Sequence, residues 1–502
     1  MNIKEAKEQI KNTVTAYLTK NELGRYMIPP QKQRPIFLMG PPGIGKTAIM
    51  EQIASELGIG LLSYSMTHHT RQSALGLPVI KQVKYGGVEY DISEYTMSEI
   101  ISSVHKMIER SGIPNGILFL DEINCVSETL TPIMLQFLQY KVFGMHEVPA
   151  GWIVVTAGNP PQYNRSVREF DIATWDRLKR IDVEPDFDTW KEFAYLSGIH
   201  PSVMTYLELK PGNFYKVETT VDGKSFITAR GWDDLSQMIR LYELHGIAID
   251  GKLTSQYIQN KQISQDFAIY YDLYTKYRSK YQISTILDGT AGSALKAQAK
   301  NAKFDERYAM LGMLLDAVMA EMKTAMSADD LLVKLLGLLR EYKSQLELPG
   351  DPVQKLAIVR RSAENEYGSR EQSRSLSEDD RELYTRLLDI LHEEILTAKE
   401  APGREFAAVK QDFDSRVKAY DEQVKKTSMH TSNMFRFVEE VYSNGQELII
   451  LVTELTANPI SARFLGRYSV PEYLSASNEL VFHKRNVELM QEITDLRLDD
   501  LI

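Results

Sequence analysis

One eight-residue loop near the N-terminus restricts the possible folds of this chain more than any other feature. Residues 40–47 read Gly-Pro-Pro-Gly-Ile-Gly-Lys-Thr and follow the apolar run 36–39, which predicts a buried strand. The glycines allow successive backbone N–H groups to turn inward around an anion. The residues after the loop continue as a helix, whose N-terminus favours the same anion. The pattern therefore predicts a phosphate-binding loop between a strand and a helix.

This loop indicates a bound nucleoside triphosphate with Mg²⁺. Lys46 supplies a positive charge for the β- and γ-phosphates, and Thr47 offers its hydroxyl to Mg²⁺. The residues expected to surround the nucleotide are Gly40, Pro41, Pro42, Gly43, Ile44, Gly45, Lys46, Thr47 and Ala48.

Two adjacent acids follow a second apolar run. Residues 117–120 predict a buried strand that ends in Asp121 and Glu122. Asp121 is expected to hold Mg²⁺ through its water shell, and Glu122 to orient and deprotonate an attacking water. Taken alone, such a pair also fits a strand that ends in solvated acids, but together with the phosphate loop it predicts hydrolysis.

A polar amide ends a third apolar strand. The run 152–157 leads into Gly158 and Asn159, which two prolines follow. At the carboxyl edge of a central strand, Asn159 would lie on the same rim as Asp121 and Glu122 and could contact the γ-phosphate or the water. The alternative is an Asx turn before the prolines.

The spacing of strands and helices divides the chain into three parts. Short apolar strands at 36–39, 61–64, 117–120, 153–157 and 181–183 alternate with helical patterns, which predicts a parallel sheet covered by helices within residues 1–184. Residues 185–250 predict a small, mostly helical lid, with a hairpin around Asp222 and Gly223. Residues 251–502 predict an all-α extension with a break at 346–380.

Two details of the extension are specific expectations. The sequence Ser-Ala-Asp-Asp at 327–330 has the form of a capping box, and so predicts a helix that begins there and is buried. The stretch 363–380 is polar and rich in serine, which favours a linker or loop.

The composition of the chain restricts the partners and the cellular compartment that we expect for it. The formal charge is −10, so nucleic acid is an unlikely partner. Cys125 is the single cysteine, which excludes an intramolecular disulfide and suits a reducing compartment. The chain opens directly into a charged helical pattern, and no apolar run approaches the ~20 residues that span a bilayer. We therefore expect a cytoplasmic protein without a membrane partner.

Together, the phosphate loop, Asp121, Glu122 and Asn159 resemble the motifs of the AAA+ ATPases, in particular those of the MoxR family. The resemblance implies an α/β P-loop NTPase core, ATP and Mg²⁺ as cofactors, and Asn159 as the sensor that contacts the γ-phosphate. It also implies a ring oligomer, typically a hexamer, and a protein substrate such as one with a von Willebrand factor A domain.

The same resemblance identifies catalytic arginines. Residues 170–178 look like the segment that carries the family's arginine finger, with Leu178 in place of an aromatic residue. It implies that Arg177 reaches the nucleotide of the next subunit, with Arg180 as a competitor. Arg230, in Thr-Ala-Arg at 228–230, resembles the lid arginine that contacts the γ-phosphate, although Ala229 replaces the family's proline.

An alternating segment at 75–92 predicts a hairpin with Gly-Gly at its turn. In MoxR-like and chelatase-like relatives an insertion here projects toward the central pore. Tyr85 is therefore either a substrate-gripping aromatic or a residue that only flanks the turn.

The sequence thus predicts a MoxR-like ATPase that uses ATP hydrolysis for chaperone-like remodelling or maturation of a protein partner. The alternatives are a nucleic-acid-associated AAA+ motor or loader, a chelatase-type motor subunit, and a nucleotide-gated scaffold with little turnover. The presence of Glu122 disfavours the scaffold.

Overall fold

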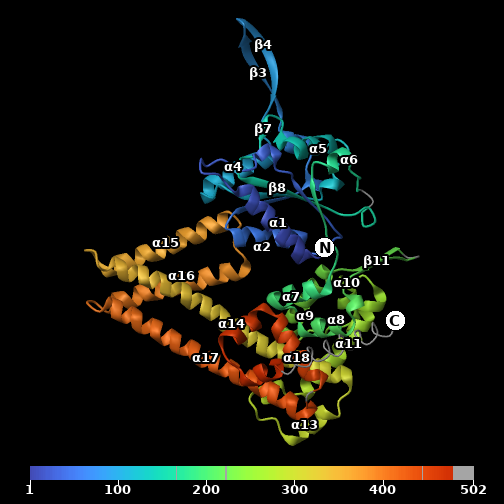
Figure 1. Cartoon of the computed structure of the whole chain (residues 1–502), viewed down its shortest axis with the longest axis vertical. Helices are drawn as coiled ribbons and strands as arrows, with labels where there is room; N and C mark the ends of the chain where they lie inside the picture. Colours follow the sequence, from blue (N-terminus) through green and yellow to red (C-terminus); the bar gives the residue numbers. More distant parts are fainter. Residues whose placement is uncertain (165–166, 221–222, 444, 479–502) are drawn as a thin grey trace, which may run out of the picture. The chain divides into compact units, whose positions relative to one another are not determined.

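The computed structural model describes residues 1–164, 167–220, 223–443 and 445–478. The chain forms two compact units, drawn in Figure 1. Unit 1 comprises residues 1–189 and 354–393, and unit 2 comprises residues 190–353 and 394–502. The three-part division predicted from the sequence remains a prediction, but unit 1 includes forty residues of the helical extension.

Unit 1 is built on a five-stranded parallel sheet with the order β2-β5-β8-β1-β9. Its strands are β1 (Ile36–Met39), β2 (Gly60–Ser65), β5 (Gly116–Asp121), β8 (Trp152–Gly158) and β9 (Lys179–Asp182). All five strands expected from the apolar runs are confirmed, as is the α/β fold class. β5 and β8 are almost continuously buried, as central strands covered on both faces should be.

Helices and short hairpins connect these strands. The helical segments are α1 (Ile3–Leu18), η1 (Pro30–Lys32), α2 (Lys46–Leu57), η2 (Met66–His68), α3 (Arg71–Leu75), α4 (Glu99–Ser111), η3 (Ile123–Cys125), α5 (Thr131–Tyr140) and α6 (Ile172–Trp175). The hairpins are β3 (Pro78–Tyr85) with β4 (Val88–Tyr95) and β6 (Val142–Phe143) with β7 (His146–Glu147).

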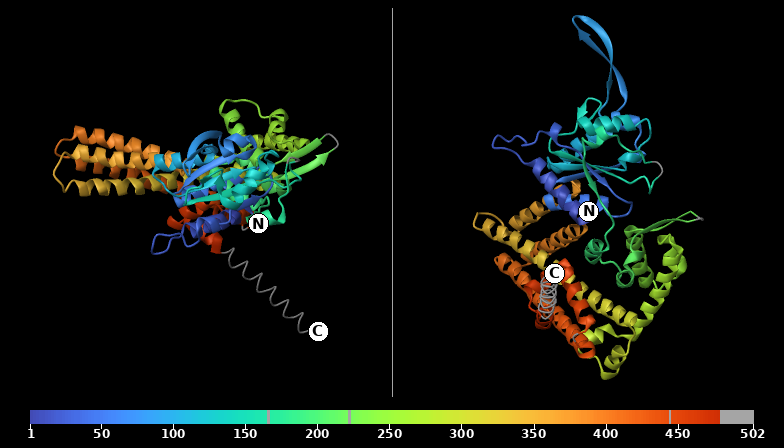
Figure 2. Two further views of the ribbon diagram at one scale, coloured as in Figure 1. Left: turned by 90° about the horizontal axis from the view of Figure 1, so that it is seen from above. Right: turned by 45° about the vertical axis from the view of Figure 1, so that its right-hand side comes forward.

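The β3–β4 hairpin confirms the prediction for residues 75–92 and extends away from the rest of unit 1 (Figure 1 and the right-hand view of Figure 2). Gly86 and Gly87 have φ of 60° and 89° at its turn, a conformation that glycine adopts without strain. Tyr85 is 60% exposed, and its ring centroid lies 6.2 Å from that of Tyr90. Both interpretations of Tyr85 are compatible with this position.

The C-terminal extension returns to the sheet through α15 (Pro352–Gln372) and α16 (Glu378–Glu400). The turn between these helices covers β2, the edge strand, because the Leu61 N–H donates to the carbonyl of Ser373 at 2.9 Å. Ser55 of α2 donates to Asp380 at 3.1 Å. Ser373, Ser375 and Leu376 are buried in this turn. An exposed sheet edge is thereby closed by a part of the chain more than 300 residues away.

Unit 2 contains the predicted lid hairpin and most of the helical extension. The described hairpin strands are β10 (Lys216–Thr220) and β11 (Gly223–Ile227), and Asp222 lies outside the described residues. The helices are α7 (Phe187–Ser197, which begins in unit 1), α8 (Pro201–Leu209), η4 (Pro211–Asn213), α9 (Ala229–Leu244), α10 (Gly251–Tyr257), α11 (Lys261–Lys280), α12 (Ile283–Leu287), α13 (Ser293–Lys300), α14 (Phe304–Gln345), α17 (Glu405–Tyr442), α18 (Gln446–Ala457) and α19 (Pro459–Arg467).

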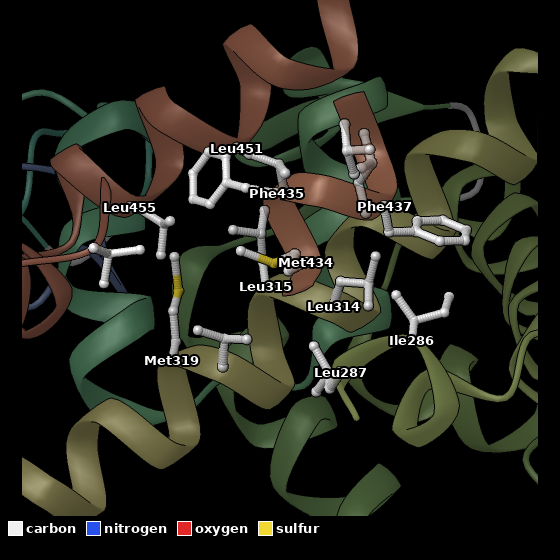
Figure 3. Packing of buried hydrophobic residues seen from close by; sticks show 14 of the residues in the cluster. Ile286, Leu287, Leu314, Leu315, Met319, Met434, Phe435, Phe437, Leu451 and Leu455 are labelled. Carbon is white, nitrogen blue, oxygen red and sulfur yellow. The ribbon is translucent and has the colours of Figure 1, made fainter. Parts of the chain in front are cut away.

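The core of unit 2 lies between α12, α14, α17 and α18. Figure 3 shows its centre, formed by Ile286, Leu287, Leu314, Leu315, Met319, Met434, Phe435, Phe437, Leu451 and Leu455. Close contact also joins α8 to α14, since a Cβ on Gly312 would lie 2.1 Å from Thr205 Cγ2. The helices of the predicted lid therefore pack directly on the extension.

A buried ionic network strengthens that junction. Lys191 Nζ lies 2.5 Å from Glu208 Oε1 and 2.5 Å from Glu454 Oε1, and Tyr308 donates to Glu208 at 2.6 Å. Burial, together with the charge of Glu208, raises the pKa of Glu454, while Lys191 opposes this shift. The network links α7, α8, α14 and α18.

Two predictions for the extension are wrong. No helix begins at 327–330, because α14 runs without a break from Phe304 to Gln345. Asp329 is instead buried and paired with Arg463 and Arg467. The expected loop at 363–380 is mostly helix, with only residues 373–377 between α15 and α16.

Among the described residues, no single helix has the length and apolar character needed to cross a membrane. α18 and α19 meet the criteria of length and composition only when taken together, and they meet at a bend of 94°.

Leu376→Ala should loosen the cover on β2, because truncating a leucine that is 5% exposed leaves a cavity costing about 2–3 kcal/mol. Hydrogen exchange of peptides that span β2 should therefore become faster. Leu348→Ala is the matched control, since Leu348 is 65% exposed. Equal protection of β2 in Leu376→Ala and wild type would contradict the role of this turn.

Candidate functional site

The candidate site lies where parallel strands end together. Met39 pairs with Gly158 and Ser65 pairs with Asp121, so the residues that follow these strands reach the same edge of the sheet. This edge is the usual ligand-binding edge of an open α/β sheet. It gathers the phosphate loop, the two acids and Asn159.

The phosphate loop has the backbone that its glycines predict. Gly43 and Gly45 have φ of 73° and 91°, and α2 begins directly afterwards at Lys46. A Cβ on Gly40 would lie 2.8 Å from Ile44 Cδ1 and 3.0 Å from the carbonyl of Val183. Glycine is therefore required for the close approach at position 40 as well as for the turn.

Lys46 is buried, and its ammonium joins the loop to the end of β8. Nζ donates to the carbonyls of Gly40 at 2.8 Å and Pro41 at 2.9 Å, and to Asn159 Oδ1 at 2.9 Å. The structure thus brings the predicted sensor amide to the predicted phosphate-binding lysine. The side chain of Asn159 points to the site instead of forming only a local Asx turn.

Thr47 and Asp121 also meet. The Thr47 hydroxyl donates to Asp121 Oδ2 at 3.4 Å, while Asp121 Oδ1 accepts from the Glu122 N–H at 2.8 Å. A hydroxyl and a carboxylate side by side are the hard oxygen ligands that Mg²⁺ prefers. No cluster of three His, Cys, Asp or Glu side chains suited to a metal occurs in the described parts of the chain.

Glu122 is held in place by residues that sequence reasoning missed. Its φ of 55° lies in the left-handed region, which is uncommon for a residue with a side chain. Its Oε2 accepts from Ser65 at 3.1 Å and from Thr67 at 3.0 Å, leaving Oε1 as the other acceptor. Ser65 ends β2 and Thr67 lies in η2, so the signal that could have identified them is their position at the end of the strand beside β5.

The two arginine candidates differ in their surroundings. Arg180 stacks over the Trp175 ring at 4.7 Å and forms hydrogen bonds to both carboxylate oxygens of Asp182 at 2.8–3.0 Å. Arg177 is exposed and forms no side-chain hydrogen bond within the described residues. A hydrogen bond from Thr174, together with the nearby charge of Arg177, lowers the pKa of Asp171.

Aromatic side chains in the segment 170–178 pack against the sheet close to these two arginines. Phe170 and Trp175 make edge-on contacts with Phe37 of β1, with ring centroids 5.6 and 5.1 Å apart. Leu178 is buried in the same core. The segment 170–178 is therefore anchored to the sheet.

Arg230 and Cys125 are the remaining residues that the sequence indicated as candidates. Arg230 is exposed in the first turn of α9 in unit 2, and its role as a lid contact remains a prediction. Burial raises the pKa of the Cys125 thiol, and the charges of Glu122 and Asp121 act in the same direction. Because a thiol with a raised pKa is a weak nucleophile at neutral pH, Cys125 has no evident chemical role in this site.

Comparison with known families agrees with this geometry. Residues 36–170 match the family model described as "ATPase family associated with various cellular activities (AAA)". The matched segment contains the phosphate loop, both acids and Asn159, and this part of the chain is similar to AAA ATPase domains. Arg177 and Arg230 lie outside the matched residues. No curated protein matches the chain.

Thr67→Val should lower the rate of ATP hydrolysis about tenfold with little change in ATP affinity, because Glu122 loses one of the two donors that fix its carboxylate. Steady-state hydrolysis and nucleotide titration measure the two effects. Thr15→Val is a control with the same substitution on the exposed side of α1, where the hydroxyl donates to the carbonyl of Lys11 in the same helix. An unchanged turnover number in Thr67→Val would show that Glu122 does not need this contact.

Proposed function

We propose that this chain is a MoxR-like AAA+ ATPase that couples Mg-ATP hydrolysis to remodelling or maturation of a protein partner. The observation that supports it most is the convergence of Lys46, Asp121, Glu122 and Asn159 at one edge of the sheet. The residues fit Mg-ATP: left-handed glycines form the loop, a buried lysine is at its centre, and two hard oxygen ligands meet beside it.

Each residue has a separate task in this proposal. Phosphate oxygens compete with the Gly40 and Pro41 carbonyls for the Lys46 ammonium, because they carry full negative charge. Bound Mg²⁺, held by Thr47 directly and by Asp121 through the water shell of the ion, would neutralise charge on the phosphates. Glu122 accepts a proton from water as the water oxygen bonds to the γ-phosphorus and the bond to the ADP oxygen breaks. Asn159 orients the γ-phosphate or the water.

Assembly is part of the proposal. The exposed guanidinium of Arg177 supports a ring in which it stabilises transition-state charge at a neighbour's nucleotide. Arg230 would act in the same subunit, from the lid. The resemblance to MoxR proteins supports a protein substrate with a von Willebrand factor A domain, and the acidic charge of −10 argues against a nucleic-acid motor.

Lys46→Ala and Glu122→Gln should fail at different steps. Lys46→Ala loses the cation for the phosphates and should weaken ATP binding severely, whereas Glu122→Gln should bind ATP and stop turnover. Nucleotide affinity and steady-state hydrolysis distinguish the two. Glu128→Gln is the matched control, because Glu128 is exposed and pairs with Arg168 at the surface. Loss of ATP binding in Glu122→Gln would contradict its assignment as the base.

Mixed oligomers test the action of Arg177 between subunits. Arg177→Ala and Glu122→Gln subunits should each be inactive alone, but mixing them should restore partial hydrolysis. The restored activity belongs to junctions where an intact Glu122 meets a neighbour's intact Arg177. Arg180→Ala is the control and should remain active alone, since Arg180 pairs with Asp182 in its own chain. Recovery with Arg180→Ala mixtures and not with Arg177→Ala mixtures would make Arg180 the finger.

A further inference from the structure

Asn124 occupies a position that none of the recognised motifs explains. It lies two residues after Glu122, in the short turn η3, and it is only 2% exposed. Its Nδ2 donates to the carbonyl oxygen of Asn159 at 2.9 Å. A buried asparagine thus connects the turn that carries Glu122 to the backbone of the residue that contacts Lys46.

The local sequence explains why a side chain is needed there. Asn159 is followed by Pro160 and Pro161, and β8 ends at Gly158. Proline has no N–H, so neither residue can donate a backbone hydrogen bond at the end of this strand. The Asn124 amide supplies a donor to the partly buried carbonyl of Asn159, which stabilises the end of the strand.

The fit between the two segments is tight. A Cβ on Gly158 would lie 2.5 Å from Asn124 Oδ1 and 2.7 Å from its Cγ, so the amide packs against the Gly158 backbone. The carbonyl of Asn124 accepts from the Arg168 N–H at 2.9 Å. Asn124 therefore holds three segments: the Glu122 turn, the end of β8, and the stretch that leads toward Arg177.

We propose that Asn124 is a positioning residue, which fixes the Asn159 side chain relative to Glu122. This inference rests on the proposed function, because it assigns Asn159 and Glu122 to one hydrolytic site. A change in the Glu122 turn moves Asn124. Because Asn124 donates a hydrogen bond to the Asn159 carbonyl, the peptide of Asn159 moves with it. The base and the sensor then adjust together instead of independently.

Asn124→Asp is the sharpest variant, since it keeps the shape of the side chain and removes the N–H donor. It should lower kcat for ATP hydrolysis about tenfold, while KM and the Kd for ATP change less than threefold. In an Asn159→Ala background the same substitution should cost less than threefold, because Asn124 acts through Asn159. An equal loss in both backgrounds would overturn the proposal.

Trp152→Phe separates positioning from stability. Trp152 lies at the opposite end of β8, and its Nε1 has no hydrogen-bond partner among the described residues. Shrinking this buried ring should lower the melting temperature and leave kcat within twofold of wild type. A loss of kcat in Trp152→Phe that matches Asn124→Asp at the same melting temperature would assign Asn124 a structural role only.

Hydrogen exchange keeps the test independent of turnover. In Asn124→Asp, peptides covering residues 152–164 should exchange faster than in wild type, whereas those covering α1 should not change. If wild type does not hydrolyse ATP, the proposed function fails, and this exchange measurement still decides whether Asn124 orders the end of β8. Unchanged exchange would overturn the proposal.

Discussion

The parallel register of β2, β5, β8 and β1 is the constraint on which the whole candidate site depends. Each strand delivers one group to the same edge, and a slip of one residue would move that group by about 3.3 Å and turn it to the opposite face of the sheet. The contacts in the site, such as Lys46 to Asn159 at 2.9 Å, could not survive such a slip. The buried apolar residues that fix the register therefore also fix the geometry of the candidate site.

The sequence predicts those parts of the site whose chemistry is local. A phosphate loop needs glycine, lysine and threonine within eight residues, and the proposed catalytic base and metal ligand are adjacent in the sequence as Glu122 and Asp121. The roles of Ser65, Thr67 and Asn124 cannot be predicted in this way, because their hydrogen-bond partners lie at least 35 residues away in the sequence. They are recognisable only when the order of strands is known, since β2 and β8 are both neighbours of β5.

The helical half shows where local patterns mislead. Asp329 has the sequence context of a helix cap, yet it lies within α14 and pairs with Arg463 and Arg467 from α19. A short acidic sequence looks the same whether it caps a helix or forms ion pairs from within one. Likewise, residues 363–372 are polar but helical, since α15 needs only a narrow buried face that includes Val359 and Ala363. In both cases, contacts with residues distant in the sequence determine the local structure.

Edge strand β2 is held by contacts at both of its ends. These contacts link the helical extension to the candidate site. Near its start, Leu61 donates to Ser373 in the α15–α16 turn, and at its end Ser65 donates to Glu122. A sheet edge without a neighbour tends to fray or to pair with other chains. Fraying of β2 would release the hydroxyl that steadies the candidate base, four residues along the same strand. Covering the edge with residues 373–377 thus protects the position of Glu122 as well as the sheet, and this explains why a segment so distant in sequence belongs to the nucleotide-binding unit.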